Sequence, residues 1–398
     1  MKIGIYGGTF NPPHLGHLAA ARFAIEALGL DRLLFIPDAL PPHKELPEGS
    51  PDGAHRLAMT GLAADSMLLP KKVEVCPLEL ERPGLSYTAD TLRLLGERYP
   101  GDELWLLMGT DMFLTLQDWR EPESIMAQAG ICAFARAADD RMEELDGQAA
   151  RLRDTYGARV KTLRLPNLVD VSSTQLRALL AEGEGQDYLA PAVYGYILMH
   201  RLYGTHADLT RLSDEDLRCC SYSMIRAKRI AHVRGTEEEA ERLARRWGAD
   251  PVMARRAGIL HDCTKYLEMD EQLKLCEKYD ILLDDLERQA VKLLHSKTGS
   301  AIAGHVFGEP PEVCEAIFWH TTGKADMTLL EKILYIADYM EPNRDFPGVE
   351  RLRELAYQDL DAAVLLGCEM SIQEMAERKL PVHPNTLRAR DWLLRTKG

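Results

Sequence analysis

The sequence lacks long hydrophobic runs, paired cysteines and an excess of positive charge. No apolar stretch approaches the length that a membrane span requires, so no transmembrane segment is predicted. The eight cysteines include no Cys-x-x-Cys spacing, which favours free thiols in a reducing compartment over a disulfide framework. The start of the chain has no charged segment followed by an apolar one, as a secretory signal would have. These absences together predict a cytoplasmic protein.

The formal net charge of −14 at pH 7 argues against a general nucleic-acid-binding protein. Counterion release on a nucleic acid requires a basic surface, so general nucleic-acid binding is not expected. The acidic residues are spread over both halves of the chain rather than gathered in a tail. Anionic substrates must then be bound by local features such as a helix N-terminus, a few placed basic groups or a metal ion.

The first half of the chain alternates short apolar runs with helical patterns. At 398 residues the chain exceeds what one hydrophobic core usually organises, so two domains are expected. The apolar runs of the first half are Lys2–Tyr6, Leu33–Ile36, Glu103–Met108 and Ile131–Ala135. Strands separated by helical segments predict an α/β fold with a doubly wound parallel sheet, whose ligands bind outside the carboxyl ends of the strands.

The pattern changes after Gly204, where long amphipathic stretches replace the strand-like runs. These stretches are Ala240–Trp247, Val252–Leu267, Gln289–Val306 and Leu329–Met340. We therefore predict a separate all-α domain in the second half. The segment between the halves is polar and without strong periodicity. The predicted domains are 1–205 and 214–398, with a linker at 206–213.

The first motif of chemical interest is the segment Gly7-Gly8-Thr9-Phe10-Asn11-Pro12-Pro13-His14-Leu15-Gly16-His17. Glycines after a strand bring backbone N–H groups within reach of a phosphate, and the positive end of the next helix adds to the attraction. His14 and His17 stand three residues apart, so both imidazoles can face one anion. The alternative is that the two histidines only cap the helical turn. The glycine pair in front of them favours anion binding.

A second phosphate-binding candidate is the run Ser172-Ser173-Thr174 followed by Arg177. The hydroxyl groups can cap a helix and donate hydrogen bonds, and a guanidinium one turn later can hold phosphate oxygens. Such a run alone is more often a plain N-cap. Its value comes from its pairing with the glycine motif.

With these motifs the first half resembles bacterial nicotinate mononucleotide adenylyltransferases of the nucleotidylyltransferase superfamily. Besides the glycine motif and the Ser-Ser-Thr-x-x-Arg segment, the resemblance rests on Pro41-Pro42-His43-Lys44, Ser86-Tyr87-Thr88-Ala89-Asp90-Thr91-Leu92, and Gly109-Thr110-Asp111 followed by Trp119. It implies transfer of AMP from ATP to nicotinate mononucleotide, giving deamido-NAD and pyrophosphate. Another small phosphorylated acceptor, such as phosphopantetheine, is the alternative. Lys44 and Trp119 weigh against it.

The resemblance also implies roles for individual residues. The set implied for ATP, which would bind with Mg, is Gly7, Gly8, Thr9, Phe10, His14, His17, Asp111, Ser173, Thr174 and Arg177. The set implied for the nicotinate nucleotide is Lys44, Thr88 and Trp119. His14 and His17 are the implied catalytic pair, because they would stabilise charge that develops between the α and β phosphates.

A set of potential metal ligands is spread through the second half. Its members are His232, His261, Asp262, His295, His320 and Asp338. Each stands beside apolar residues in a predicted helix, and buried imidazoles and carboxylates must pair or bind a cation. Any one of these histidines alone would more often be a satisfied core residue. As a set without thiolates they suit one or two Fe, Mn, Mg, Co or Zn ions. His305 and His383 lie outside this pattern.

The metal-ligand set resembles the HD superfamily of metal-dependent phosphohydrolases. The segments Trp319–Gly323 and Leu329–Arg344 resemble the branch of bacterial symmetrical diadenosine tetraphosphate hydrolases. This branch implies cleavage of diadenosine tetraphosphate into two ADP, with iron as the favoured metal. We expect Asp262 and Lys265 to be catalytic, with the lysine binding a substrate phosphate. The alternatives are that the second half cleaves a different nucleotide phosphoester, or that it senses nucleotides without turnover. The sequence leaves the oligomeric state open.

Overall fold

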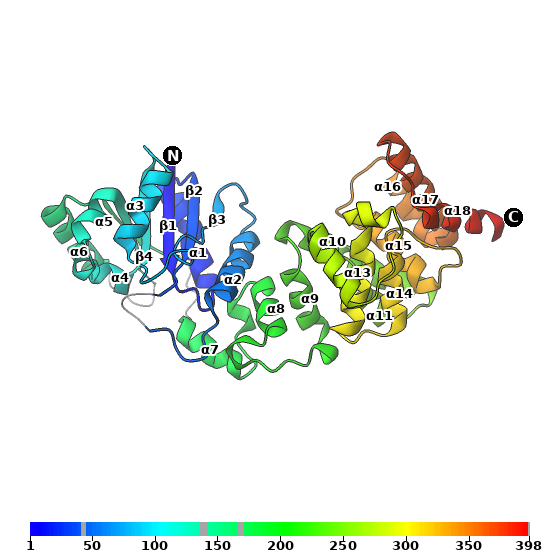
Figure 1. The fold of residues 1–398 in the computed structure, drawn as a ribbon, viewed down its shortest axis with the longest axis horizontal. Coiled ribbons are helices and arrows are strands. Elements are labelled where there is room, and N and C mark those ends of the chain that lie inside the picture. Colours follow the sequence, from blue (N-terminus) through cyan, green and yellow to red (C-terminus); the bar gives the residue numbers. More distant parts are fainter. Residues whose placement is uncertain (41–44, 136–141, 166–170, 397–398) are drawn as a thin grey trace. The chain divides into compact units, whose positions relative to one another are not determined.

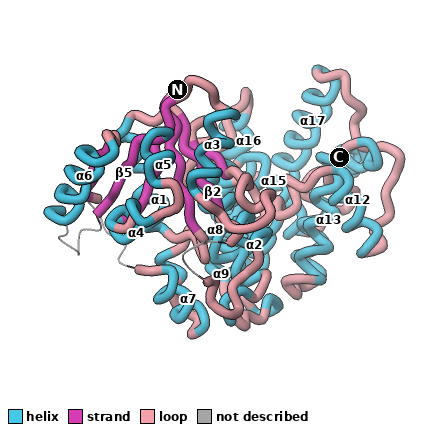
Figure 2. Tube along the Cα trace, turned by 60° about the vertical axis from the view of Figure 1, so that its left-hand side comes forward, coloured by secondary structure: helices cyan, strands magenta, loops and turns pink. Residues whose placement is uncertain are grey.

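The protein is described by a computed structural model that covers residues 1–40, 45–135, 142–165 and 171–396. These residues divide into two compact units, Met1–His206 and Ala207–Gly398, so the division falls at the start of the predicted linker. Figure 1 colours the chain from blue at the N-terminus to red at the C-terminus. Strands occur in the first unit, and the described residues of the second unit form helices and loops (Figure 2).

The first unit is built on one parallel sheet of six strands in the order β3-β2-β1-β4-β5-β6. The strands are β1 (Lys2–Gly8), β2 (Arg32–Pro37), β3 (Val73–Val75), β4 (Glu103–Gly109), β5 (Ala129–Ala135) and β6 (Val160–Arg164). The predicted doubly wound fold is therefore confirmed. The order reverses between β1 and β4, and this switch point opens a crevice outside the carboxyl ends of both strands.

Helices cover both faces of this sheet, which explains why its strands read as continuous apolar runs. Along β2, Leu34 and Ile36 belong to one buried apolar cluster, while Leu33 and Phe35 belong to another. This alternation follows from the period of two in a strand. The helices are α1 (Leu15–Leu28), α2 (Gly53–Ser66), α3 (Thr88–Arg98), α4 (Thr110–Leu114), α5 (Pro122–Gln128), α6 (Met142–Tyr156), α7 (Ser173–Ala181) and α8 (Pro191–Met199).

The two edge strands, β3 and β6, were not predicted from the sequence. β3 is only three residues long, too short to form a recognisable apolar run. β6 contains only Val160 and Leu163 as apolar residues, and only Leu163 is buried, because an edge strand is only partly covered. Edge strands of this kind carry a weaker hydrophobic signal than the central strands.

The second unit is helical. Its helices are α9 (Asp214–Ser223), α10 (Ala227–Trp247), α11 (Pro251–Leu260), α12 (Met269–Lys278), α13 (Val291–His305), α14 (Pro311–Trp319), α15 (Leu329–Met340), α16 (Val349–Gln358), α17 (Leu360–Glu377) and α18 (Pro384–Thr396). The packed core joins apolar residues of α10, α15, α16 and α17 with others from α11 and α18. The prediction of a separate helical domain fold is confirmed.

One predicted helical stretch is wrong in its extent. Val252–Leu267 was expected to continue as one helix, but α11 ends at Leu260 and the chain then forms tight turns. The backbone carbonyl of Thr264 accepts a hydrogen bond from the Gln272 side chain (2.7 Å), and the Thr264 hydroxyl donates to the carbonyl of His295 (2.9 Å). These buried tertiary bonds replace the bonds that a longer helix would have made.

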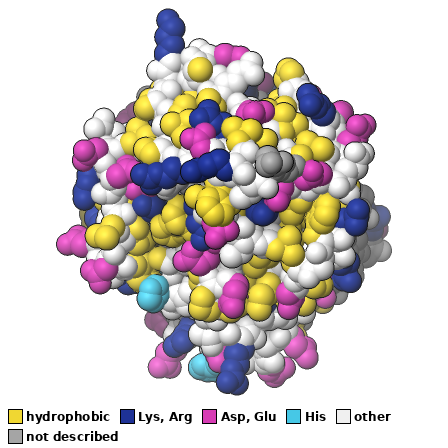
Figure 3. All heavy atoms as spheres, turned by 90° about the vertical axis from the view of Figure 1, so that its right-hand side faces the viewer, with side chains coloured by type: hydrophobic (Ala, Val, Ile, Leu, Met, Phe, Trp, Pro, Cys, Tyr) yellow, Lys and Arg dark blue, Asp and Glu magenta, His cyan; other side chains and the backbone are white. Residues whose placement is uncertain are grey.

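The described helices include none that is long and apolar enough to cross a membrane. On the face of the molecule drawn in Figure 3, basic and acidic side chains are interspersed rather than gathered by sign.

Gly258 allows α10 and α11 to approach closely. A Cβ atom on Gly258 would lie 2.6 Å from the Cα atom of Glu237, which belongs to the backbone of α10. Real Cβ atoms do not approach backbone so closely, so any side chain at this position would push the two helices apart. His232 lies on α10 and His261 directly follows α11, so this contact also sets the distance between two predicted metal ligands.

We predict that Gly258→Ala loosens the α10–α11 pair. Overpacking should lower the free energy of local opening by about 1–3 kcal/mol. Hydrogen exchange of peptides from both helices, followed by mass spectrometry, measures this loss. Gly61→Ala is the matched control, because Gly61 is also in a helix but a Cβ there has no neighbour within 4 Å. Unchanged protection in Gly258→Ala would contradict the steric argument.

Candidate active sites

A cavity of about 400 Å³ lies at the switch point of the sheet. It is bordered by the loop after β1 and by the start of α4, which follows β4. All ten residues that the sequence suggested for ATP line it: Gly7, Gly8, Thr9, Phe10, His14, His17, Asp111, Ser173, Thr174 and Arg177. A Cβ on Gly7 would meet no protein atom within 4 Å, so the glycine leaves backbone exposed to this space.

His14 and His17 both cap the start of α1 through their Nδ1 atoms. The Nδ1 atom of His14 accepts a hydrogen bond from the backbone N–H of Gly16 (3.2 Å), and that of His17 accepts one from the N–H of His14 (3.1 Å). A neutral imidazole whose Nδ1 accepts must carry its hydrogen on Nε2. Capping and anion binding are thus compatible, because the cap leaves each ring an Nε2–H donor beside the cavity.

The helix α7 brings the second motif to the same cavity. Ser172 caps α7, and its hydroxyl accepts a hydrogen bond from the backbone N–H of Gln175 (3.2 Å). Arg177 donates from Nη1 to the carbonyl of Asn11 in the glycine motif (2.9 Å). It also donates from Nη2 to the hydroxyl of Thr174 (3.1 Å). The guanidinium therefore joins the two motifs before any ligand binds.

A second cavity of about 380 Å³ lies on the other side of the glycine loop. It shares Gly7, Gly8 and Thr9 with the first cavity and contains Thr88 and Trp119, two of the three residues suggested for the nicotinate nucleotide. The third, Lys44, lies outside the described residues. Two ligands bound in these cavities would meet at the glycine loop.

Buried charged residues near these cavities were missed by the sequence analysis. Arg56 is 1% exposed and donates from Nη1 to the carbonyl of Thr9 (2.9 Å) and to Asp38 (3.3 Å), so it fixes the loop from behind. Glu79 lines the second cavity, and burial raises the pKa of its carboxyl. Neither belongs to a motif with recognisable spacing, so no signal in the sequence marks them.

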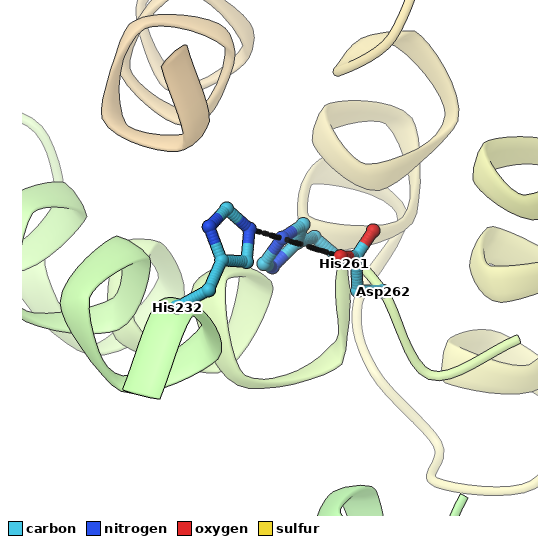
Figure 4. Close-up of side chains that lie close together, drawn as sticks. All are labelled: His232, His261 and Asp262. Atoms are coloured by element: carbon cyan, nitrogen blue, oxygen red, sulfur yellow. Dashed lines mark hydrogen bonds and ion pairs between the residues drawn. The ribbon is translucent and has the colours of Figure 1, made fainter. Parts of the chain in front are cut away.

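The six predicted metal ligands come together in the second unit. His232 lies on α10, His261 and Asp262 follow α11, His295 lies on α13, His320 follows α14 and Asp338 lies on α15. The Nε2 atoms of His232 and His261 are 3.2 Å apart, and those of His295 and His320 are 3.1 Å apart. In Figure 4, His232 and the His261–Asp262 pair point toward one another.

The Nδ1 atoms of these histidines determine what the Nε2 atoms can do. Each Nδ1 lies near an oxygen acceptor. For three of the histidines this is a backbone carbonyl at 2.7 Å: Gly258 for His261, Lys292 for His295 and Ile317 for His320. For His232 it is the carboxylate of Glu341 at 3.0 Å. Oxygen acceptors place the hydrogen on Nδ1 and leave a lone pair on Nε2 of His261, His295 and His320. His232 differs, because its Nε2 also lies 3.0 Å from Asp338; although burial opposes it, hydrogen bonds to Asp338 and Glu341 raise the pKa of His232. Paired lone pairs about 3 Å apart repel unless a cation lies between them, and first-row metal ligands have about this spacing.

Asp262 connects the two histidine pairs. Its Oδ2 atom lies 3.7 Å and 3.6 Å from the Nε2 atoms of His232 and His261, while its Oδ1 atom lies 3.2 Å and 3.9 Å from those of His295 and His320. Oδ1 is fully buried and accepts no hydrogen bond from the described part of the chain. The donor set therefore fits two divalent ions that share Asp262, with Asp338 near the His232 pair at 3.0 Å.

The electrostatics of the pocket favour cation binding at neutral pH. Burial lowers the pKa of His261, His295 and His320 to about 4, so these imidazoles are neutral and able to bind metal. Although burial opposes it, the neighbouring His261 and Lys265 hold the pKa of Asp262 well below its usual range. The carboxylate therefore stays ionised.

Three basic side chains surround the same pocket. An Arg229 Nη2 atom lies 2.6 Å from Oδ2 of Asp262, Lys265 Nζ lies 3.4 Å from Oδ1 of Asp262, and an Arg344 Nη2 atom lies 2.8 Å from Asp338. Of these three, the sequence predicts a role for Lys265 alone. The prediction of a helix through Asp262 and Lys265 is wrong, because both residues lie in the turns that follow α11.

A third group of histidine and carboxylates differs from the metal pocket. His383 is 7% exposed, and its Nε2 atom lies 3.2 Å from Asp284 and 3.6 Å from Glu287. Its Nδ1 atom, however, accepts a hydrogen bond from the backbone N–H of Asn385 (3.2 Å). The hydrogen of the neutral ring is then on Nε2 and faces the carboxylates, so this group is a histidine–carboxylate contact rather than a metal centre.

Comparisons with known proteins agree with this division into two sites. A Cytidylyltransferase-like family model matches residues 5–179, and an HD domain model matches residues 229–343. The "probable nicotinate-nucleotide adenylyltransferase" of Symbiobacterium thermophilum is 39% identical over 204 residues, which is 51% of this chain and 95% of that protein. A protein of the same description from Thermus thermophilus is also 39% identical over 204 residues, covering 51% of this chain and all of that one.

A solved structure is similar to part of the chain. It is described as a "predicted HD superfamily hydrolase involved in NAD metabolism from Clostridium acetobutylicum" and is 36% identical, with a TM-score of 0.45, over 46% of this chain and 98% of that one. The fold, the sites and the family models together define a nucleotidyltransferase followed by an HD domain. The chain belongs, through its first half, to the nicotinate-nucleotide adenylyltransferase family.

We predict that Asp262→Ala abolishes uptake of both metal ions, because each carboxylate oxygen faces a different histidine pair. Isothermal titration of the metal-free protein with Mn²⁺ should give two sites per chain in the wild type and no measurable site in the variant. Asp284→Ala is the matched control, since it removes the acid next to His383 and should leave both sites. Two sites in Asp262→Ala would contradict the shared-ligand arrangement.

Proposed function

We propose that the first unit transfers AMP from ATP to nicotinate mononucleotide, giving deamido-NAD and pyrophosphate. One observation carries this proposal: two cavities meet at the same glycine loop, one lined by phosphate-binding groups and the other by Thr88 and Trp119. ATP fits the first role, and the pyridine mononucleotide fits the second. The selectivity for nicotinate over nicotinamide is proposed from the relatives, not from a residue that reads the ring.

The chemistry requires positioning and charge stabilisation rather than a covalent enzyme intermediate. The mononucleotide phosphate is already a nucleophile, and it attacks the α-phosphorus of ATP while pyrophosphate leaves. His14 and His17 donate from Nε2 to oxygens that gain charge in this step, and Arg177 adds a guanidinium. The N-termini of α1 and α7 also lie at the cavity, where the positive ends of the helix dipoles favour anions. Mg²⁺ bound with ATP would supply further charge neutralisation.

We predict that His17→Ala lowers kcat by about 10²–10³-fold, because a donor to the transition state is lost. The Kd for ATP should change much less. Rate assays of deamido-NAD formation and equilibrium binding of ATP separate the two effects. His55→Ala is the control, because His55 contacts the hydroxyl of Tyr196 (3.0 Å) and lines neither cavity. An equal loss in kcat and in ATP binding would make His17 a plain binding residue.

We further propose that the second unit is a metal-dependent phosphohydrolase that cleaves diadenosine tetraphosphate symmetrically into two ADP. The observation that carries the metal dependence is the convergence of four histidine Nε2 atoms on both oxygens of Asp262. When bound, divalent ions supply Lewis-acid activation of water and of a phosphate oxygen. Iron is the proposed native metal on the strength of the family resemblance, and manganese suits the same ligands.

The three basic side chains support a substrate with several phosphates. Arg229, Lys265 and Arg344 lie beside the carboxylates of Asp262 and Asp338. Their N–H groups suit phosphate oxygens that approach the pocket. A polyphosphate chain carries anionic oxygens on several phosphorus atoms, so it suits a pocket with three cations.

We predict that the protein loaded with Fe²⁺ or Mn²⁺ converts diadenosine tetraphosphate into ADP alone. Chromatography of the nucleotide products measures this outcome directly. Asp262→Ala should be inactive in this assay and retain adenylyl transfer, because the two sites lie in separate units. AMP and ATP as products would contradict symmetrical cleavage. No turnover by protein that binds metal would favour another phosphoester or a nucleotide sensor.

A further inference from the structure

One of the four pocket histidines has a different support from the others. His261, His295 and His320 donate from Nδ1 to a backbone carbonyl three residues earlier. His232 instead contacts the carboxylate of Glu341, which lies 109 positions further along the chain. A carboxylate partner makes an imidazole a stronger metal ligand than a neutral carbonyl does, because its negative charge increases the basicity of the opposite nitrogen.

Glu341 is itself held in place by several contacts. It is 1% exposed, and its Oε1 atom lies 3.0 Å from Nδ1 of His232. Its Oε2 atom accepts hydrogen bonds from both the backbone N–H and the side-chain amide of Asn343, each at 2.7 Å. Asn343 also donates to the carbonyl of Ala231, next to His232 (2.9 Å). The carboxylate therefore has one orientation, with one oxygen assigned to the histidine.

Gly235 provides the space that this carboxylate occupies. It lies inside α10, where glycine costs about 1 kcal/mol relative to alanine, so its presence needs a local reason. A Cβ atom on Gly235 would lie 2.3 Å from Oε2 of Glu341 and 3.1 Å from Nδ2 of Asn343. The Glu341 carboxylate thus packs directly against the backbone of α10 at Gly235, one helical turn after His232.

We propose that Glu341 is a positioning residue that orients His232 and makes the His232–His261 side of the pocket the tighter of two metal sites. The inference rests on the proposed metal-dependent function of the second unit. The His232 side also has Asp338 at 3.0 Å, whereas the His295–His320 side has only its share of Asp262 as a carboxylate among the predicted ligands. Metal should therefore load the His232 side first.

The test compares Glu341→Gln with the wild type by titration of the full-length, metal-free protein with Mn²⁺. We expect two sites of different Kd in the wild type and a roughly 10- to 100-fold weaker tight site in Glu341→Gln, with the other site unchanged. Titration with Co²⁺ gives a second readout through the visible absorption of the bound ion. In Glu341→Gln, the absorption that the wild type gains with the first equivalent of Co²⁺ should be lost. A residue with only a structural role would not change one Kd and spare the other.

Two further variants keep the inference falsifiable. Gly235→Ala retains the charge of Glu341 but displaces it, so it should weaken the same site while favouring helix formation in α10. Glu239→Gln is the matched control: Glu239 is also buried and on α10, but it accepts from the hydroxyl of Tyr357 (2.8 Å) and is not among the pocket ligands. Both Kd values should be unchanged in this control.

The outcomes separate the inference from the function on which it rests. Wild-type protein that binds no Mn²⁺ would overturn the proposed metal-dependent function itself. Wild-type protein with two sites, together with unchanged affinities in Glu341→Gln and Gly235→Ala, would overturn only the role of Glu341. Equal weakening of both sites in Glu341→Gln would also overturn it, because that result indicates a general disturbance of the pocket.

Discussion

The hydrogen bond made by Nδ1 of each histidine decides which kind of ion the other side of the ring can bind. In the first unit, backbone N–H groups donate to Nδ1 of His14 and His17, so Nε2 carries a hydrogen and suits a phosphate. In the second unit, Nδ1 of His261, His295 and His320 donates to a backbone carbonyl, so Nε2 keeps a lone pair and suits a cation. The same type of side chain thereby serves opposite charges in the two units.

The ends of helices supply these two kinds of partner. A helix N-terminus leaves N–H groups without intrahelical acceptors, and a C-terminus leaves carbonyls without donors. His14 caps the start of α1 and therefore accepts, whereas His261 and His320 follow the ends of α11 and α14 and therefore donate. His295 lies inside α13 and donates to the carbonyl of Lys292 in the same helix. His232 also lies inside a helix, α10, but its Nδ1 contacts Glu341 instead of a helix carbonyl. Among the four histidines, His232 is thus the one whose partner is a carboxylate from outside its helix.

The sequence was sufficient for the fold class of both halves and for four of the six described strands, because these follow from periodicity. It could not supply Glu341, since nothing in local spacing connects this residue with His232 across the intervening helices. Arg56 and the end of α11 at Leu260 were missed for the same reason, because both depend on buried tertiary hydrogen bonds. Hydrogen-bond partners of ring nitrogens are a tertiary property, so they become visible only in the fold.

His383 shows that proximity of histidine and carboxylates does not by itself define a metal site. It precedes α18, where the N–H of Asn385 donates to its Nδ1, so its Nε2 faces Asp284 and Glu287 with a hydrogen. The pocket around Asp262 has a similar composition but the opposite tautomers. The same criterion that assigns cations to one cluster therefore denies them to the other, and it assigns anions to the histidines of the first unit. A single local rule thus accounts for the charge preference of all three groups.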